Sequence, residues 1–136
     1  MKHIALFALP VLLLASSGAR ADDRIDCKSQ SLNQMQLDQC AGMDFQKSDA
    51  KLNALYKTLM TKYDAPNGAL LKSAEKAWLA YRDAECAYET NLTVGGTINP
   101  MMDTMCRTTK TDARVKELNA QLHCEEGDLS CNMPLK

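Results

Sequence analysis

Two acidic side chains lie within otherwise apolar stretches of this sequence, where charged groups are unexpected. Asp49 follows Phe45 at helical spacing, and Glu85 lies between Tyr81 and Tyr88 at the same kind of spacing. Both side chains should therefore lie on helix faces that meet other helices. Two carboxylates in one cleft can perform general acid–base or glycosidic chemistry. Asp49 and Glu85 are thus the pair that a glycan hydrolase would use.

Neighbouring cations favour a structural role for the same acids. Arg82 and Asp83 adjoin the stretch that holds Glu85, and Arg114 lies one turn before Leu118. Guanidinium groups can bond carboxylates in a bidentate manner and so satisfy acids that are partly buried between helices. A small helical domain rarely encloses the cleft that catalysis needs. We therefore expect no catalytic residues and a structural charge network of Asp49, Arg82, Asp83, Glu85 and Arg114.

The six cysteines could ligate a metal, react as thiols or form disulfides. The sequence contains no C-x-x-C motif, and His123 is the only histidine beyond the first 21 residues, so we expect no metal site and no cofactor. An even number of cysteines in an exported chain predicts disulfides. Their placement near helix ends and loop bases favours sequential pairing: Cys27 with Cys40, Cys86 with Cys106, and Cys124 with Cys131.

The first 21 residues are typical of a cleavable signal peptide. Lys2 precedes an apolar run over residues 4–15, and residues 19–21 form a small-x-small cleavage pattern. The run is shorter than the ~20 apolar residues that a transmembrane helix needs. No cysteine lies at the cleavage point for lipid attachment. We expect one mature domain over residues 22–136, in the periplasm or secreted, without a membrane anchor.

The charge balance restricts the partners of the mature domain. Removing Lys2 and Arg20 leaves 14 basic and 17 acidic side chains, for a net charge of −3. No basic block is present, so nucleic acid and anionic membrane surfaces are not expected as partners. A basic protein is the better match in charge.

Three stretches of helical periodicity predict an all-α fold. They cover residues 32–63, 69–89 and 99–123, and the turn-forming run 64–68 separates the first two. The connections are short, which places consecutive helices antiparallel. The expected architecture is a small bundle of about three long antiparallel helices tied by disulfides.

The ends and faces of these helices are also predicted. Ser31-x-x-Gln34 matches a capping box for the first helix, and Asn99 is the expected N-cap of the third. Met105 is assigned to the apolar face of the third helix. The expected apolar stripe of the second helix consists of Leu70, Leu71, Ala74, Ala77, Trp78, Tyr81, Ala84 and Tyr88.

Residues 90–99 form the longest expected non-helical stretch between packed helices. Connecting segments of this kind carry recognition more often than helix faces do. Two adjacent glycines allow close backbone approach and positive φ angles, and a bridge between Cys86 and Cys106 would fasten both ends. The candidate partner-binding residues in this loop are Thr93, Gly95, Gly96, Thr97 and Asn99.

Several sequence blocks occur together in a recognisable order. They are Cys40, D-x-x-L-N-x-x-Y over residues 49–56, W-x-x-Y-R-D-A-E-C over 78–86, G-G-T-x-x-P over 95–100, Cys106, and R-x-x-E-L over 114–118. Together they resemble the LprI-type family, small exported bacterial domains named after a mycobacterial lysozyme-inhibitor lipoprotein. The resemblance extends over residues 27–122. It implies an α-helical, disulfide-containing exported domain, and through the family's name it implies lysozyme inhibition.

Three functions are therefore in competition. The first is a non-enzymatic binding module, whose partner is lysozyme or another envelope protein. The second is a structural or stress-related envelope protein without a ligand site. The third is a glycan hydrolase that uses Asp49 and Glu85. An exposed, well-anchored loop over residues 90–99 would favour the first.

Overall fold

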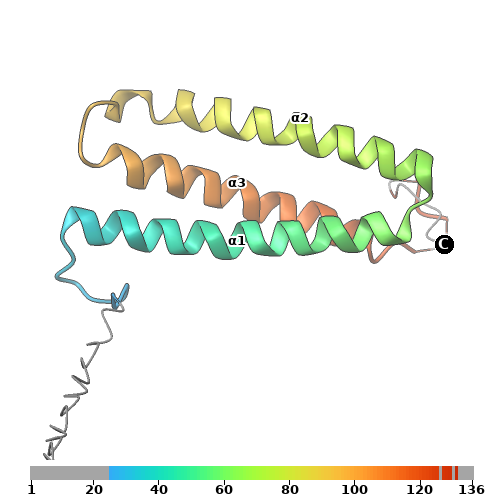
Figure 1. Ribbon diagram of the computed structural model, residues 1–136, viewed down its shortest axis with the longest axis horizontal. Helices are drawn as coiled ribbons and strands as arrows, with labels where there is room; N and C mark the ends of the chain where they lie inside the picture. The colour runs from blue at the N-terminus through green and yellow to red at the C-terminus, as the bar shows by residue number, and fades with distance from the viewer. Residues whose placement is uncertain (1–24, 126, 130, 132–136) are drawn as a thin grey trace, which may run out of the picture.

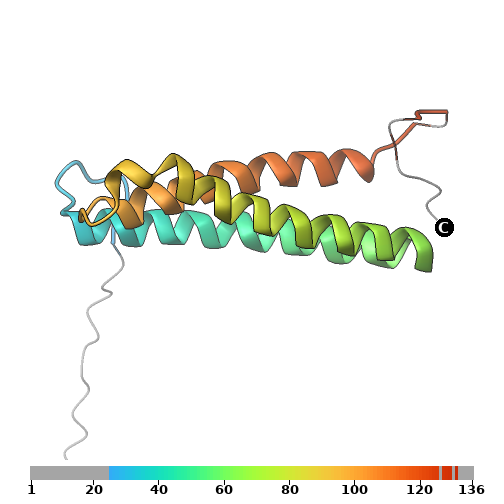
Figure 2. The same ribbon diagram turned by 90° about the horizontal axis from the view of Figure 1, so that it is seen from above.

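The computed structural model describes residues 25–125, 127–129 and 131, in which all regular structure is helical. The elements are α1 (Gln34–Lys62), α2 (Ala65–Glu89), the short 3-10 helix η1 (Asn91–Thr93) and α3 (Asn99–Gln121). Figure 1 shows α2 running back along α1, and α3 returning in the direction of α1. The view from above shows an elongated bundle rather than a sphere (Figure 2). The predicted all-α fold with three long helices is confirmed.

A capping box starts α1, two residues later than predicted. Asn33 Oδ1 accepts a hydrogen bond from the Gln36 backbone N–H at 3.0 Å, and Gln36 Oε1 accepts from the Asn33 N–H at 2.9 Å. The predicted cap Ser31 instead hydrogen-bonds with Ser29. The sequence holds two overlapping candidates for the same motif, and the helix uses the second.

The connection between α1 and α2 is shorter than the turn-forming run 64–68 suggested. Asp64 is the N-cap of α2, and its Oδ1 accepts from the Asn67 backbone N–H at 2.9 Å. Pro66 lies in the first helical turn, where a backbone N–H has no partner within the helix and its loss is harmless. Residues 65–68 are therefore helical, and α2 begins four residues before its expected start at residue 69.

The hydrophobic core lies mainly between α1 and α3, which share the most extensive helix contact. Leu52 and Leu59 of α1, together with Tyr63 at its C-terminal end, are buried against Leu118 of α3. Burial raises the pKa of the Tyr63 hydroxyl. Because α1 and α3 supply these side chains, α2 acts as a third layer that covers one side of a two-helix core.

The predicted apolar stripe of α2 is only partly correct. Tyr81 is 53% exposed and Tyr88 is 78% exposed, and Leu70 also faces outward. The buried residues of α2 are Gly68, Glu75, Arg82 and Cys86. An outer helix that covers one side of the α1–α3 pair buries only one narrow face, and here that face includes the long charged side chains of Glu75 and Arg82. Met105 of α3, expected in the core, is also half exposed.

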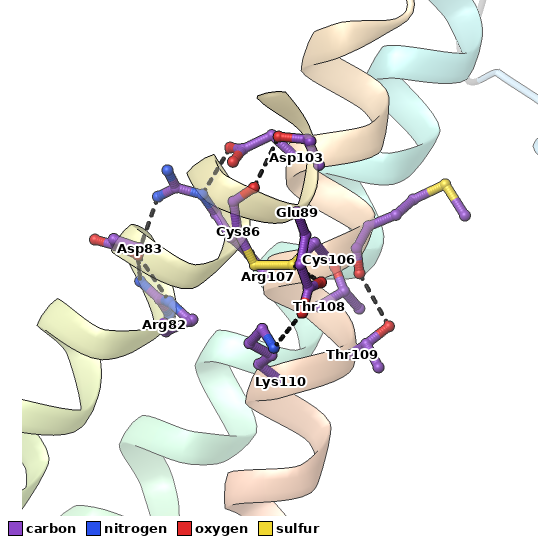
Figure 3. Close-up of a disulfide and its surroundings, with 12 residues drawn as sticks. Arg82, Asp83, Cys86, Glu89, Asp103, Cys106, Arg107, Thr108, Thr109 and Lys110 are labelled. Atoms are coloured by element: carbon purple, nitrogen blue, oxygen red, sulfur yellow. Dashed lines mark hydrogen bonds and ion pairs between the residues drawn. A yellow bond between two sulfur atoms is a disulfide. The ribbon is translucent and has the colours of Figure 1, made fainter. Parts of the chain in front are cut away.

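Three disulfides tie the bundle in the sequential order expected: Cys27 with Cys40, Cys86 with Cys106, and Cys124 with Cys131. The second joins α2 to α3 just before and after the loop between them (Figure 3). The third closes a small loop beyond the end of α3. All of the described cysteines are paired.

The expected signal peptide, residues 1–21, lies outside the described residues, and its cleavage before residue 22 stays a prediction. Among the described residues, no helix combines the length and apolar character that a membrane crossing requires.

Removing individual disulfides should affect stability unequally. Replacing Cys86 and Cys106 by alanine opens a link with a sequence separation of 20 between two packed helices. We expect this change to lower the free energy of unfolding by about 3 kcal/mol. The same change at Cys124 and Cys131 should have a much smaller effect, because that loop contributes none of the buried core residues. Urea titration of both double variants checks the order; equal losses would contradict it.

Candidate functional site

A buried guanidinium group joins all three helices at the middle of the bundle. Arg82 of α2 is only 6% exposed, and its Nη1 lies 3.4 Å from Thr111 Oγ1 of α3 and 3.9 Å from Asp49 Oδ1 of α1. Its Nη2 and Nε each lie 2.9 Å from Asp83 Oδ1. The charge is therefore compensated by two carboxylates, as a buried cation requires.

Aromatic rings complete the surroundings of Arg82. Its guanidinium carbon lies 5.3 Å from the centre of the Phe45 ring and 5.4 Å from the centre of the Trp78 ring. Both distances are within the range of cation–π attraction. The Trp78 ring also has the guanidinium of Arg114 at 5.8 Å. Two cations thus share one indole ring at the inner face of α2.

A second ion pair links α2 to α3 through a residue that the sequence analysis missed. Arg114 Nε lies 3.1 Å from Glu75 Oε2, and Nη1 lies 2.8 Å from Glu117 Oε2. Glu75 is 8% exposed, and its Oε1 has no hydrogen-bond partner among the described residues. Helical spacing could have revealed Glu75, because it lies four residues after Leu71 and three before Trp78. We call this set the charge seam: Asp49, Glu75, Arg82, Asp83, Arg114 and Glu117.

Glu85 lies outside the charge seam, which corrects its expected place there. Within the described part of the chain, no hydrogen bond or ion pair holds its carboxylate, whereas Asp49 contacts Arg82 and accepts from Asn53 Nδ2 at 2.8 Å. A groove of about 490 Å³ between α1 and α2 is lined by Asp49, Leu52, Asn53, Tyr56, Lys72, Glu75, Lys76 and Leu79. Glu85 does not line this groove, so the groove does not hold both candidate catalytic carboxylates.

The described histidine, cysteine and acidic side chains are of the types that can ligate a metal ion. Within residues 25–125, 127–129 and 131, no group of three or more histidine, cysteine or acidic side chains is placed to hold a metal ion. Asp83, Asp103 and Glu89, three carboxylates near the Cys86–Cys106 bridge, are paired with cations instead (Figure 3). Glu89 Oε1 lies 3.0 Å from Lys110 Nζ, and this hydrogen bond is the largest cause of the raised pKa of Lys110.

The loop over residues 90–99 is exposed but internally bonded. Thr93 Oγ1 donates to the Thr90 carbonyl at 2.7 Å, and Asn99 Nδ2 donates to Thr93 Oγ1 at 2.9 Å. The Gly96 N–H donates to the Thr93 carbonyl at 3.0 Å. Gly95 has φ = 84°, a left-handed conformation that favours glycine. These bonds hold the loop in one shape.

The side chains that this loop offers to a partner differ from those expected. Thr93 and Asn99 use their polar groups within the loop, whereas Gly95, Gly96 and Thr97 are exposed. Within the loop, the most exposed apolar side chains are Leu92, at 98%, and Val94, at 68%. Sequence reasoning missed both because it weighed only the hydrogen-bonding and glycine residues of the loop. Their β-branched or apolar character within a connecting segment was the available signal.

Comparison with known protein families identifies the family of this chain. The family model for the lysozyme inhibitor LprI matches residues 26–118. The chain belongs to this LprI family. The match includes the charge seam, the loop and two disulfides, while the bridge between Cys124 and Cys131 lies beyond it.

One curated relative is similar to the chain over a longer stretch than the family model matches. An uncharacterized protein of Rhizobium meliloti (strain 1021) is 32% identical over 133 residues, which cover 88% of this chain and 95% of that protein. No solved structure matches this LprI-family chain.

The residues of the charge seam should contribute unequally to the stability of this LprI-family domain. Arg114→Ala leaves the buried Glu75 carboxylate without its cation, and we expect a loss of about 3–5 kcal/mol in the free energy of unfolding. Asp49→Ala should lose about 1 kcal/mol or less, because the Asp49 side chain is 40% exposed and 3.9 Å from Arg82. Thermal and urea unfolding measure both, with the exposed Lys47→Ala as the control. Equal effects at Arg114 and Asp49 would contradict this ranking.

Proposed function

We propose that this chain is an exported, non-enzymatic protein-binding module that inhibits lysozyme, and that the loop over residues 90–99 is its main contact. Membership of the lysozyme inhibitor LprI family supports the activity. The observation that carries the choice of site is the exposure of Leu92 and Val94 on a loop that the rest of the domain holds in place.

Anchoring matters because a binding loop loses conformational freedom when it enters a cleft. Here the loop lies between two helices that the Cys86–Cys106 bridge joins, and its own hydrogen bonds fix Thr93 and Gly96 relative to Thr90. Much of the ordering cost is therefore met before binding, which favours affinity. A short, apolar-tipped loop of this kind suits a glycan-sized cleft such as that of a lysozyme.

Charge and compartment support the same proposal. The mature domain expected after removal of residues 1–21 has a net charge of −3, which attracts a basic enzyme and raises the rate of encounter. The three disulfides are consistent with export, since such bonds persist in oxidising compartments. Lysozyme is met in the same compartments, so an exported inhibitor would reach its target.

The test is inhibition of a c-type lysozyme by the purified domain of residues 22–136. We expect inhibition by the wild type at micromolar concentration. Leu92→Asp should inhibit at least tenfold more weakly, because a charge that the complex buries in the contact adds a desolvation penalty of about 1–3 kcal/mol or more. Gly95→Val should also weaken inhibition, because valine strains the positive φ of that position.

Two controls distinguish the loop from the remaining surface of the domain. Leu129→Asp alters an equally exposed apolar side chain at the far end of the molecule and should leave inhibition unchanged. Thermal melts establish that each variant is folded. No inhibition by the wild type would refute the proposed function, whereas inhibition that survives both loop variants would move the contact to another surface.

A further inference from the structure

The outward face of α2 carries an acidic residue between two exposed aromatic residues. Tyr81, Glu85 and Tyr88 lie at intervals of four and three, so their side chains share one side of the helix. The two tyrosines are 53% and 78% exposed, and no core residue covers them. We call these three residues the α2 face.

Glu85 differs from the neighbouring Asp83 and Glu89 in having no direct ion pair among the described residues. Glu89, one turn further on, is paired with Lys110 at 3.0 Å, and Asp83 is paired with Arg107 at 3.1 Å (Figure 3). Glu85 has no hydrogen bond or ion pair with any described residue, although it lies close enough to Lys110 to contribute to that residue's raised pKa. Its partly buried carboxylate, on the same side of α2 as two tyrosines, therefore keeps the capacity for a direct ion pair with a cation from outside the molecule.

We propose that the α2 face binds an arginine or lysine side chain of a basic partner protein. The cation would lie against the exposed Tyr88 ring and pair with the Glu85 carboxylate. Within the molecule itself Lys110 Nζ already lies 5.7 Å from the centre of the Tyr81 ring, which shows that a cation is accommodated against this ring. Cation–π attraction and charge pairing act together at such a site.

The position of the α2 face next to the loop supports a protein partner. α2 ends at Glu89, and the exposed Leu92 and Val94 follow within a few residues. Exposed apolar and aromatic side chains that adjoin one another are characteristic of protein–protein contacts, and tyrosine is prominent among residues that dominate binding energy. The proposal rests on the proposed function only for the identity of the partner as lysozyme.

The first experiment needs no lysozyme. A capped tri-arginine peptide is titrated into the isotope-labelled domain of residues 22–136 and followed by NMR, with a capped tri-glutamine peptide as the neutral control. We expect saturable shifts concentrated at Tyr81, Glu85 and Tyr88, which Glu85→Gln abolishes. Glu125→Gln removes an exposed carboxylate beyond the end of α3 and should change nothing. Shifts spread evenly over all acidic residues, or unchanged in Glu85→Gln, would overturn the proposal.

The second experiment measures the dissociation of the complex with c-type lysozyme. Glu85→Gln and Tyr88→Ala should each speed dissociation about two- to fivefold, and the double variant about tenfold, the range expected for an exposed cation–π and ion-pair contact. Leu70→Ala, at an exposed apolar position near the other end of α2, is the matched control. If both variants dissociate as slowly as the wild type, the α2 face is not part of the contact, and the proposed contact through the loop is unaffected. If the wild type does not bind, lysozyme is refuted as the partner, and the peptide titration alone decides the proposal for the α2 face.

Discussion

The arrangement of α2 depends on one constraint: two guanidinium groups, one buried and one partly buried, lie against a single tryptophan. Arg82 and Arg114 both lie near the Trp78 ring, and each must find carboxylates because an unpaired buried cation is strongly destabilising. Asp49, Asp83 and Glu75 fulfil this need from two helices. The position and rotation of α2 are therefore set by charge pairing as much as by apolar contact.

This rotation determines what the domain shows to its surroundings. With Arg82 and Cys86 turned inward, residues on the opposite side of α2 must face outward, and these include Tyr81 and Tyr88. The same helix then ends beside the bridge that holds the loop. A single orientation of α2 thus accounts for the internal charge pairing, the exposed aromatic face and the position of the loop beside the bridge.

Sequence periodicity was sufficient for the number and approximate limits of the helices, because each carries a long repeat of apolar residues. It was less informative about the face of α2. Residue type and spacing placed Tyr81 and Tyr88 in the apolar stripe, and Glu75 was overlooked. In a thin bundle the outer helix buries little, so a long charged side chain can displace an aromatic one at the interface. Which partner each acid takes depends on the packing of three helices, and this information is absent from any single stretch of sequence. The disulfide order could be anticipated, since each pair spans one helix end or loop base.

The segments before α1 and after α3 lie at opposite ends of the bundle. The described chain enters at the end that carries the loop, next to the start of α1, whereas the segment beyond α3 lies at the opposite end (Figure 1). The Cys27–Cys40 bridge fastens the entering segment to α1, so this polarity is fixed. A molecule immobilised through its first residues would turn the loop toward the supporting surface and hinder access. One held through its last residues would project the loop outward, about a full helix length away from the point of attachment.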